Sequence, residues 1–171
     1  PHIEARVNAS LDSLSATLAC PDGTPFDVRA SVAYADAAVL SVSVRAGYVC
    51  GGPYPTPDAN LSETFDLATG ERVPFRALWR DDNTARVAIA GVLAATLAPP
   101  AIAADEACID VVSEDALADA TFDYTLTPEG LRVQPELPHA IAVCAAEALV
   151  PYASVAAFAA DGGVLVRASA H

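Results

Sequence analysis

The sequence predicts an α+β fold, in which a mostly antiparallel sheet is packed by an N-terminal helix and one further main helix. Three observations predict it: a helical apolar stripe near the N-terminus, several alternating segments joined by short turns, and an alanine-rich run of helical period in the middle. With 171 residues, of which 53% are hydrophobic, the chain is long enough to bury one substantial core. We therefore expect a single domain over residues 1–171.

The first half of the chain begins with apolar residues spaced four, four, three and four apart, which predict a helix over residues 2–19. These residues are Ile3, Val7, Leu11, Leu14 and Leu18. Two alternating segments, 26–34 and 39–49, then predict an antiparallel hairpin. The expected elements after it are a Gly/Pro-rich surface loop at 50–57, a strand at 60–67, a tight turn at 68–71 and a strand at 72–75.

In the second half, a short helical turn at 76–80 is expected to bring Leu78 and Trp79 to the core. A helix with its N-cap at Asn83 or Thr84 is predicted over 85–98, and Pro99 and Pro100 should end it. The remaining expectations are an irregular segment at 101–120, a hairpin of 121–127 with 131–137, a strand at 141–150, a short helix at 153–160 and a last strand at 164–167.

The formal net charge is −13, and every basic residue is Arg. A surface of this sign repels nucleic acid, whose binding depends on Lys and Arg, and attracts cationic proteins. The alternative is that acidity only keeps the domain soluble. No membrane span is expected, because Pro99 and Pro100 interrupt the apolar run that ends at Ala104.

Four cysteines, at positions 20, 50, 108 and 144, lie far apart without a C-x-x-C pair or a nearby His, which is the wrong spacing for zinc. An even number of isolated cysteines instead predicts two disulfides and an oxidising compartment. Of the three pairings, we favour Cys20–Cys50 and Cys108–Cys144. The alternative is four free buried thiols in a cytosolic protein. We expect no metal and no other cofactor.

Several short features occur in a particular order along the chain. They are the strand LSVSV at 40–44, the Gly51-Gly52 corner, Phe65-Asp66-Leu67 with Thr69-Gly70, Leu78-Trp79, and the hairpin over 122–133. This order resembles the extracytoplasmic domain of RsiV anti-sigma factors, which also occurs beside some peptidoglycan deacetylases. The resemblance implies a non-catalytic module, either a receptor for a cationic muramidase or a companion of cell-wall enzymes. Family members often carry a His where this chain has Pro53-Tyr54-Pro55.

Two groups of residues are candidates for binding. Tyr54 lies among prolines that preorganise its loop and lower the entropy cost of binding; the alternative is that this loop only turns the chain. Asp105, Glu106, Glu114 and Asp115 present carboxylates to Arg or Lys of a partner. Here the alternative is a solvated acidic loop.

Catalytic and metal-binding patterns are missing from the sequence. Asp81-Asp82-Asn83 lacks the spacing of a calcium loop and fits a helix cap better. The only internal histidine, His139, has no G-x-S-x-G partner, so a Ser/His/acid triad is not expected. We therefore expect no enzyme activity.

Two functions of different classes remain. The first is a periplasmic or secreted binding or sensing domain of a bacterial cell-envelope protein, anchored through a segment outside this chain, that recognises a cationic protein such as lysozyme. The second is an accessory or structural domain that binds cell-wall glycan such as peptidoglycan, or supports a cell-wall enzyme.

Overall fold

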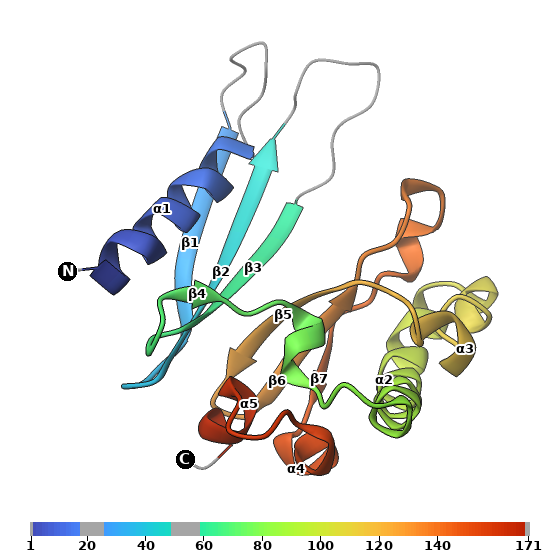
Figure 1. Cartoon of the computed structure of the whole chain (residues 1–171). Helices are drawn as coiled ribbons and strands as arrows, with labels where there is room; N and C mark the ends of the chain where they lie inside the picture. Colours follow the sequence, from blue (N-terminus) through green and yellow to red (C-terminus); the bar gives the residue numbers. More distant parts are fainter. Residues whose placement is uncertain (1, 18–25, 49–58, 170–171) are drawn as a thin grey trace. The chain divides into compact units, whose positions relative to one another are not determined.

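A computed structural model describes residues 2–17, 26–48 and 59–169 of the chain (Figure 1). The chain divides into two compact units, residues 1–73 and 74–171, which are described separately. The predicted α+β class is confirmed, since antiparallel sheets occur together with an N-terminal helix and one long main helix. The strands of the described residues form two sheets where one was expected. The single domain over 1–171 stays a prediction.

Unit 1 contains a four-stranded antiparallel sheet in the order β1-β2-β3-β4, with helix α1 alongside it (Figure 1). Its elements are α1 (His2–Thr17), β1 (Phe26–Ala35), β2 (Val39–Tyr48), β3 (Ala59–Asp66) and β4 (Glu71–Arg72). The predicted N-terminal helix and the first hairpin are confirmed over the described residues.

The predicted apolar stripe holds α1 on the sheet. Val7 packs with Val42 of β2 and Phe65 of β3, and Ile3 and Leu11 lie against this cluster. Phe65 is fully buried, and burying a side chain of this size contributes about 2 to 3 kcal/mol. The helical spacing on α1 and the alternation on β2 and β3 thus place apolar side chains from three segments in one cluster.

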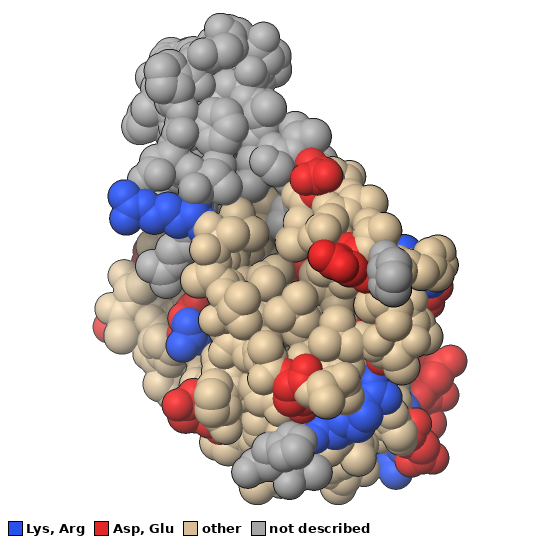
Figure 2. All heavy atoms as spheres, turned by 90° about the vertical axis from the view of Figure 1, so that its left-hand side faces the viewer, with Lys and Arg blue, Asp and Glu red and all other residues tan. Residues whose placement is uncertain are grey.

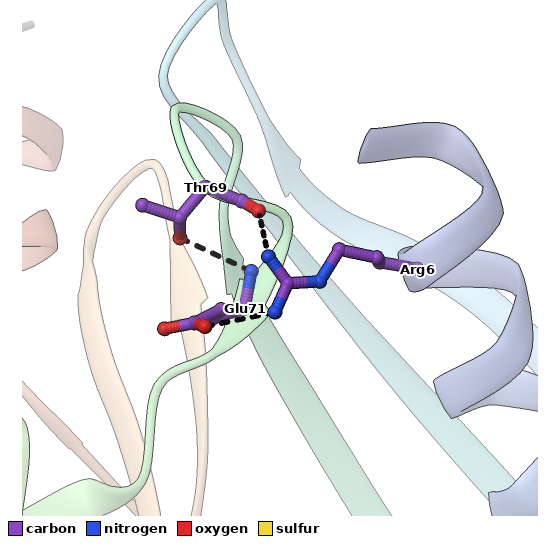
Figure 3. Close-up of polar contacts among 3 residues, drawn as sticks. All are labelled: Arg6, Thr69 and Glu71. Carbon is purple, nitrogen blue, oxygen red and sulfur yellow. Dashed lines mark hydrogen bonds and ion pairs between the residues drawn. The ribbon is translucent and has the colours of Figure 1, made fainter. Parts of the chain in front are cut away.

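Polar contacts also join α1 to the turn between β3 and β4 (Figure 3). The Arg6 guanidinium donates to the Thr69 carbonyl oxygen and to Glu71 Oε1, both at 2.8 Å, and the Glu71 backbone N–H donates to Thr69 Oγ1 at 3.2 Å. Arg6 and Glu71 are exposed, so this ion pair contributes at most about 1 kcal/mol. These contacts therefore determine the position of α1 against the turn and contribute little to the stability of unit 1.

The turn between β1 and β2 is closed by the side chain of Asp36. Its Oδ1 accepts from the backbone N–H groups of Ala38 and Val39 at 2.6 and 2.7 Å, and Tyr34 Oη donates to Oδ2 at 2.9 Å. Desolvation, then this hydrogen bond and then the carboxylate charge raise the pKa of Tyr34 above its ordinary value.

Unit 2 contains a three-stranded antiparallel sheet in the order β5-β6-β7, together with the long helix α2. The elements are η1 (Phe75–Leu78), α2 (Asn83–Ala104), η2 (Glu106–Ile109), α3 (Glu114–Leu117), β5 (Phe122–Thr127), β6 (Gly130–Pro135), η3 (His139–Cys144), β7 (Ala148–Val150), α4 (Tyr152–Val155), η4 (Ala156–Phe158) and α5 (Val164–Ala168). The hairpin predicted over 121–137 is confirmed by the pairing of β5 with β6.

The prediction that Pro99 and Pro100 end the main helix was wrong, because α2 continues through both to Ala104. Each proline removes one backbone donor from the helix. Both are exposed, whereas Leu97 and Ala101 on the other side are fully buried. Packing on both sides of the prolines therefore holds the last turn in the helix. Its final bond joins the Asp105 N–H to the Ala101 carbonyl oxygen.

Helix α2 is also long and apolar enough to cross a membrane, judged by length and composition alone. Pro99 and Pro100 were expected to interrupt this apolar run, but the helix continues through both of them. Core helices of globular domains meet the same criterion, and α2 packs against β7, η2, η3 and α3 within unit 2. The absence of a membrane span stays a prediction.

Three further predictions in unit 2 were wrong. Residues 101–120, expected to be irregular, contain the end of α2, η2 and α3. The expected strand at 141–150 is reduced to β7, and the last strand at 164–167 is helix α5. In α5 the buried residues Val164, Leu165 and Ala168 have helical spacing. A run of only five residues is too short for this period to be read from sequence.

The expectation that Leu78 and Trp79 face the core is confirmed for Leu78, which is fully buried. Trp79 is half-buried and contacts the ring of Phe75 edge-on, with centroids 5.4 Å apart. Phe75 in turn packs against Phe122 and Tyr124. These aromatic side chains therefore pack against one another within unit 2.

The helix-cap interpretation of Asp81-Asp82-Asn83 is confirmed, with Asp82 as the N-cap one residue before the predicted position. Asp82 Oδ1 accepts from the Ala85 N–H at 2.7 Å. Asp82→Ala is expected to lower the free energy of unfolding by about 1 kcal/mol, because the acceptor is lost. Asp82→Asn keeps an acceptor and should stay within a few tenths of a kcal/mol of wild type. Urea denaturation measures both, and equal losses for the two variants would contradict the cap.

Candidate functional site

The candidate site is the segment from Asp105 to Asp119, which connects the end of α2 to β5. It contains six acidic residues and no basic residue. They are Asp105, Glu106, Asp110, Glu114, Asp115 and Asp119, and all six are exposed. The four carboxylates predicted from sequence therefore lie in one acidic segment together with two that were not singled out.

Local structure explains how the chain places these carboxylates. Asp105 is the N-cap of η2, where its Oδ1 accepts from the Ala107 N–H at 2.9 Å, and Glu106 lies in the first turn. Ser113 caps α3 and accepts from the Ala116 N–H, with Glu114 and Asp115 in the first turn. Acidic residues at helix N-termini are stabilised by the orphan backbone N–H groups. The expected irregular loop is therefore two capped helical turns.

Two contacts hold the acidic segment against α2. A Cβ built on Gly91 would lie 3.7 Å from Glu114 Oε2, so the Glu114 side chain runs along the helix surface. Arg86 Nη1 contacts Asp119 Oδ1 at 3.0 Å. Among the described residues, Asp119 is the only one of the six in an ion pair. The other five carboxylates therefore face solvent without a cationic partner in that part of the chain.

The disulfide Cys108–Cys144 is confirmed and lies within this site. It joins η2 to η3 with a Cα–Cα distance of 5.3 Å, and both cysteines are buried. The crosslink ties the acidic segment to η3, which runs into β7 and the sheet. The acidic segment is therefore fixed at both its α2 end and its disulfide.

Three predicted site residues lie outside the described residues. They are Tyr54 of the Gly/Pro loop and the cysteines Cys20 and Cys50. The binding role of Tyr54 and the second disulfide stay predictions.

The acidic excess is not spread evenly over the chain. Figure 2 shows a face on which acidic and arginine side chains are interspersed among a larger area of other residues. In contrast, no Lys or Arg occurs anywhere between Arg86 and Arg132, a stretch that includes the whole acidic segment. This segment is therefore the part of unit 2 best suited to attract a cation.

Within the described ranges, no three His, Cys, Asp or Glu side chains are grouped so that they could hold a metal ion. A scan against protein-family models found no matching family, and a search of curated proteins found no match. The resemblance to the RsiV-type domain, and the function it implies, therefore stay predictions.

Four residues in or beside this site were not predicted from the sequence: Asp110, Asp119, Ile109 and, in η3, Val143. The two aspartates belong to the same run without basic residues, so the charge pattern already contained that signal. Ile109 and Val143 are exposed neighbours of the bonded cysteines. Their exposure depends on how the disulfide packs and has no sequence signature.

Proposed function

We propose that this chain is a non-catalytic, extracytoplasmic binding domain of a bacterial cell-envelope protein that recognises a cationic protein such as lysozyme. One observation carries the proposal: six exposed carboxylates occur in the disulfide-anchored segment 105–119, and only Asp119 has an ion-pair partner among the described residues. A preorganised field of one sign steers an oppositely charged protein and raises its association rate.

The disulfide supports a periplasmic or secreted location, since such bonds persist in oxidising compartments. The burial of aromatic side chains favours protein recognition over glycan recognition. Phe122 and Tyr124 are buried, and among the side chains that the structure describes none of the exposed large hydrophobic ones is aromatic. Stacking on sugar rings requires such an exposed aromatic face.

The test measures the binding of lysozyme to the intact chain, rather than to isolated unit 2, by surface plasmon resonance. The variant D105N/E106Q/E114Q/D115N is expected to lower the association rate about tenfold at low ionic strength, with less effect at high salt. Asn at position 105 keeps the cap acceptor, so η2 should remain formed. Circular dichroism checks that the variant remains folded.

A matched control removes the same number of charges elsewhere, as E4Q/D12N/E129Q/D161N. All four of these residues are exposed and lie outside the acidic segment. If both variants slow association equally, net charge rather than the segment is responsible. Retention of the wild type on insoluble peptidoglycan without affinity for lysozyme would favour the accessory glycan-binding role instead.

A further inference from the structure

Exposed apolar side chains gather around the Cys108–Cys144 disulfide. Among the residues whose side chains the structure describes, the exposed large hydrophobic ones are Val32, Val87, Ile109, Ile141, Val143, Leu149 and Val166. Three of these seven, Ile109, Ile141 and Val143, lie within three residues of a bonded cysteine. Exposed apolar residues that are scattered singly need no explanation, but a group at one crosslink is a candidate contact surface.

We call this group the disulfide patch (Ile109, Ile141 and Val143), and the crosslink limits how far apart Ile109 and Val143 can lie. Ile109 and Val143 are each 58% exposed, whereas the neighbouring cysteines are at most 4% exposed. Each Cα lies about 3.8 Å from that of its cysteine. Because the two cysteine Cα atoms are 5.3 Å apart, those of Ile109 and Val143 are at most about 13 Å apart.

The surroundings of the patch are acidic. Asp105, Glu106 and Asp110 lie within four residues of Ile109 and are exposed. No Lys or Arg occurs in η2, α3 or η3. An apolar centre with a charged rim is the usual anatomy of a protein–protein contact.

We propose that the disulfide patch is the anchor for a basic protein surface that presents an aliphatic or aromatic side chain between Lys or Arg residues. This inference rests on the proposed function and adds where and how the partner is held. The carboxylates accelerate encounter, and the apolar contact slows dissociation.

Charge complementarity selects this occupant over two others. A symmetric dimer places the same patch of both copies face to face, which would bring the two acidic segments together. An anionic lipid surface is repelled by the same carboxylates. A basic protein is the partner for which both the rim and the centre are favourable.

The test compares I109S/V143S with the control V32S/V166S, which replaces two exposed valines, one in β1 and one in α5. For the lysozyme complex, I109S/V143S is expected to raise the dissociation rate about tenfold and to leave the association rate within about twofold. The control should leave both rates unchanged. A dissociation rate of I109S/V143S equal to wild type overturns the patch while the proposed function stands.

A second probe keeps the inference testable if lysozyme does not bind. An amphipathic Lys/Leu helical peptide is titrated against the ¹⁵N-labelled chain, with an all-Lys peptide of equal charge as control. Only the Lys/Leu peptide should shift the amide signals of Ile109, Ile141 and Val143. Shifts there without lysozyme affinity support the patch and reject lysozyme as partner, whereas no binding of either probe overturns both proposals.

Discussion

Replacing both cysteines of the Cys108–Cys144 disulfide with alanine is expected to lower the free energy of unfolding by about 4 kcal/mol. The bond spans 36 residues, and its loss restores the corresponding chain entropy to the unfolded state. Alanine is preferred over serine because both positions are buried and a hydroxyl there would need a partner. Guanidinium denaturation measures the loss. An unchanged free energy of unfolding would mean that the crosslink does not constrain the unfolded chain.

Reductant provides the matched comparison and also tests the second predicted disulfide. If Cys108–Cys144 were the only bond, a reducing agent would destabilise the wild type and leave C108A/C144A unchanged. With Cys20 and Cys50 paired as predicted, C108A/C144A is expected to lose further stability on reduction. Detection of free thiols at Cys20 and Cys50 in the oxidised wild type would reject that pair.

Gly130→Ala is expected to destabilise unit 2 by about 2 to 4 kcal/mol. Gly130 begins β6 with φ +158°, and a Cβ there would overlap the carbonyl oxygen of Val150 in β7. Because of this overlap, the backbone must move. Because Leu131 is paired with Val150, the movement should disturb the β6–β7 ladder.

Gly162→Ala is the control for this prediction. Gly162 also has a positive φ, +65°, but an added Cβ would meet no atom within 4 Å. Its substitution should therefore cost only the conformational term of about 1 to 2 kcal/mol. Urea denaturation compares the two variants, and hydrogen exchange of the Leu131 and Val150 amides locates the damage. Equal losses would show that the contact with Val150 does not matter.

In the acidic segment, the sequence predicted which residues are exposed but not their local structure. Asp105, Glu106, Glu114 and Asp115 were predicted from their place in an acidic segment of the sequence to present carboxylates to a partner, and all four are exposed. Their local structure was not predicted, because caps by Asp105 and Ser113 belong to turns too short to have a readable period. The apolar group at Ile109 and Val143 was also missed, since exposure depends on what packs around the disulfide.

Long periodic segments were read correctly, and short apolar runs were not. The stripe Ile3, Val7 and Leu11 and the alternation in β1, β2, β5 and β6 each extend over enough residues to define a face. The runs at 141–150 and 164–167 are short and mix Ala, which favours helix, with Val, which favours strand, so local propensity does not choose between the two. Their packing in unit 2 decided between the two.

The sequence by itself therefore determined the α+β class, the N-terminal helix, the two main hairpins and the exposed acidic residues. These features follow from periodicity, turn residues and charge, which act over neighbouring positions. Only the tertiary structure decided that Cys108 pairs with Cys144, that α2 continues through Pro99 and Pro100, that the described strands form two sheets, and that Ile109 and Val143 are exposed beside the disulfide. These outcomes depend on contacts between residues distant in the chain, because burial of Leu97 and Ala101 stabilises a helix that local propensity alone would end.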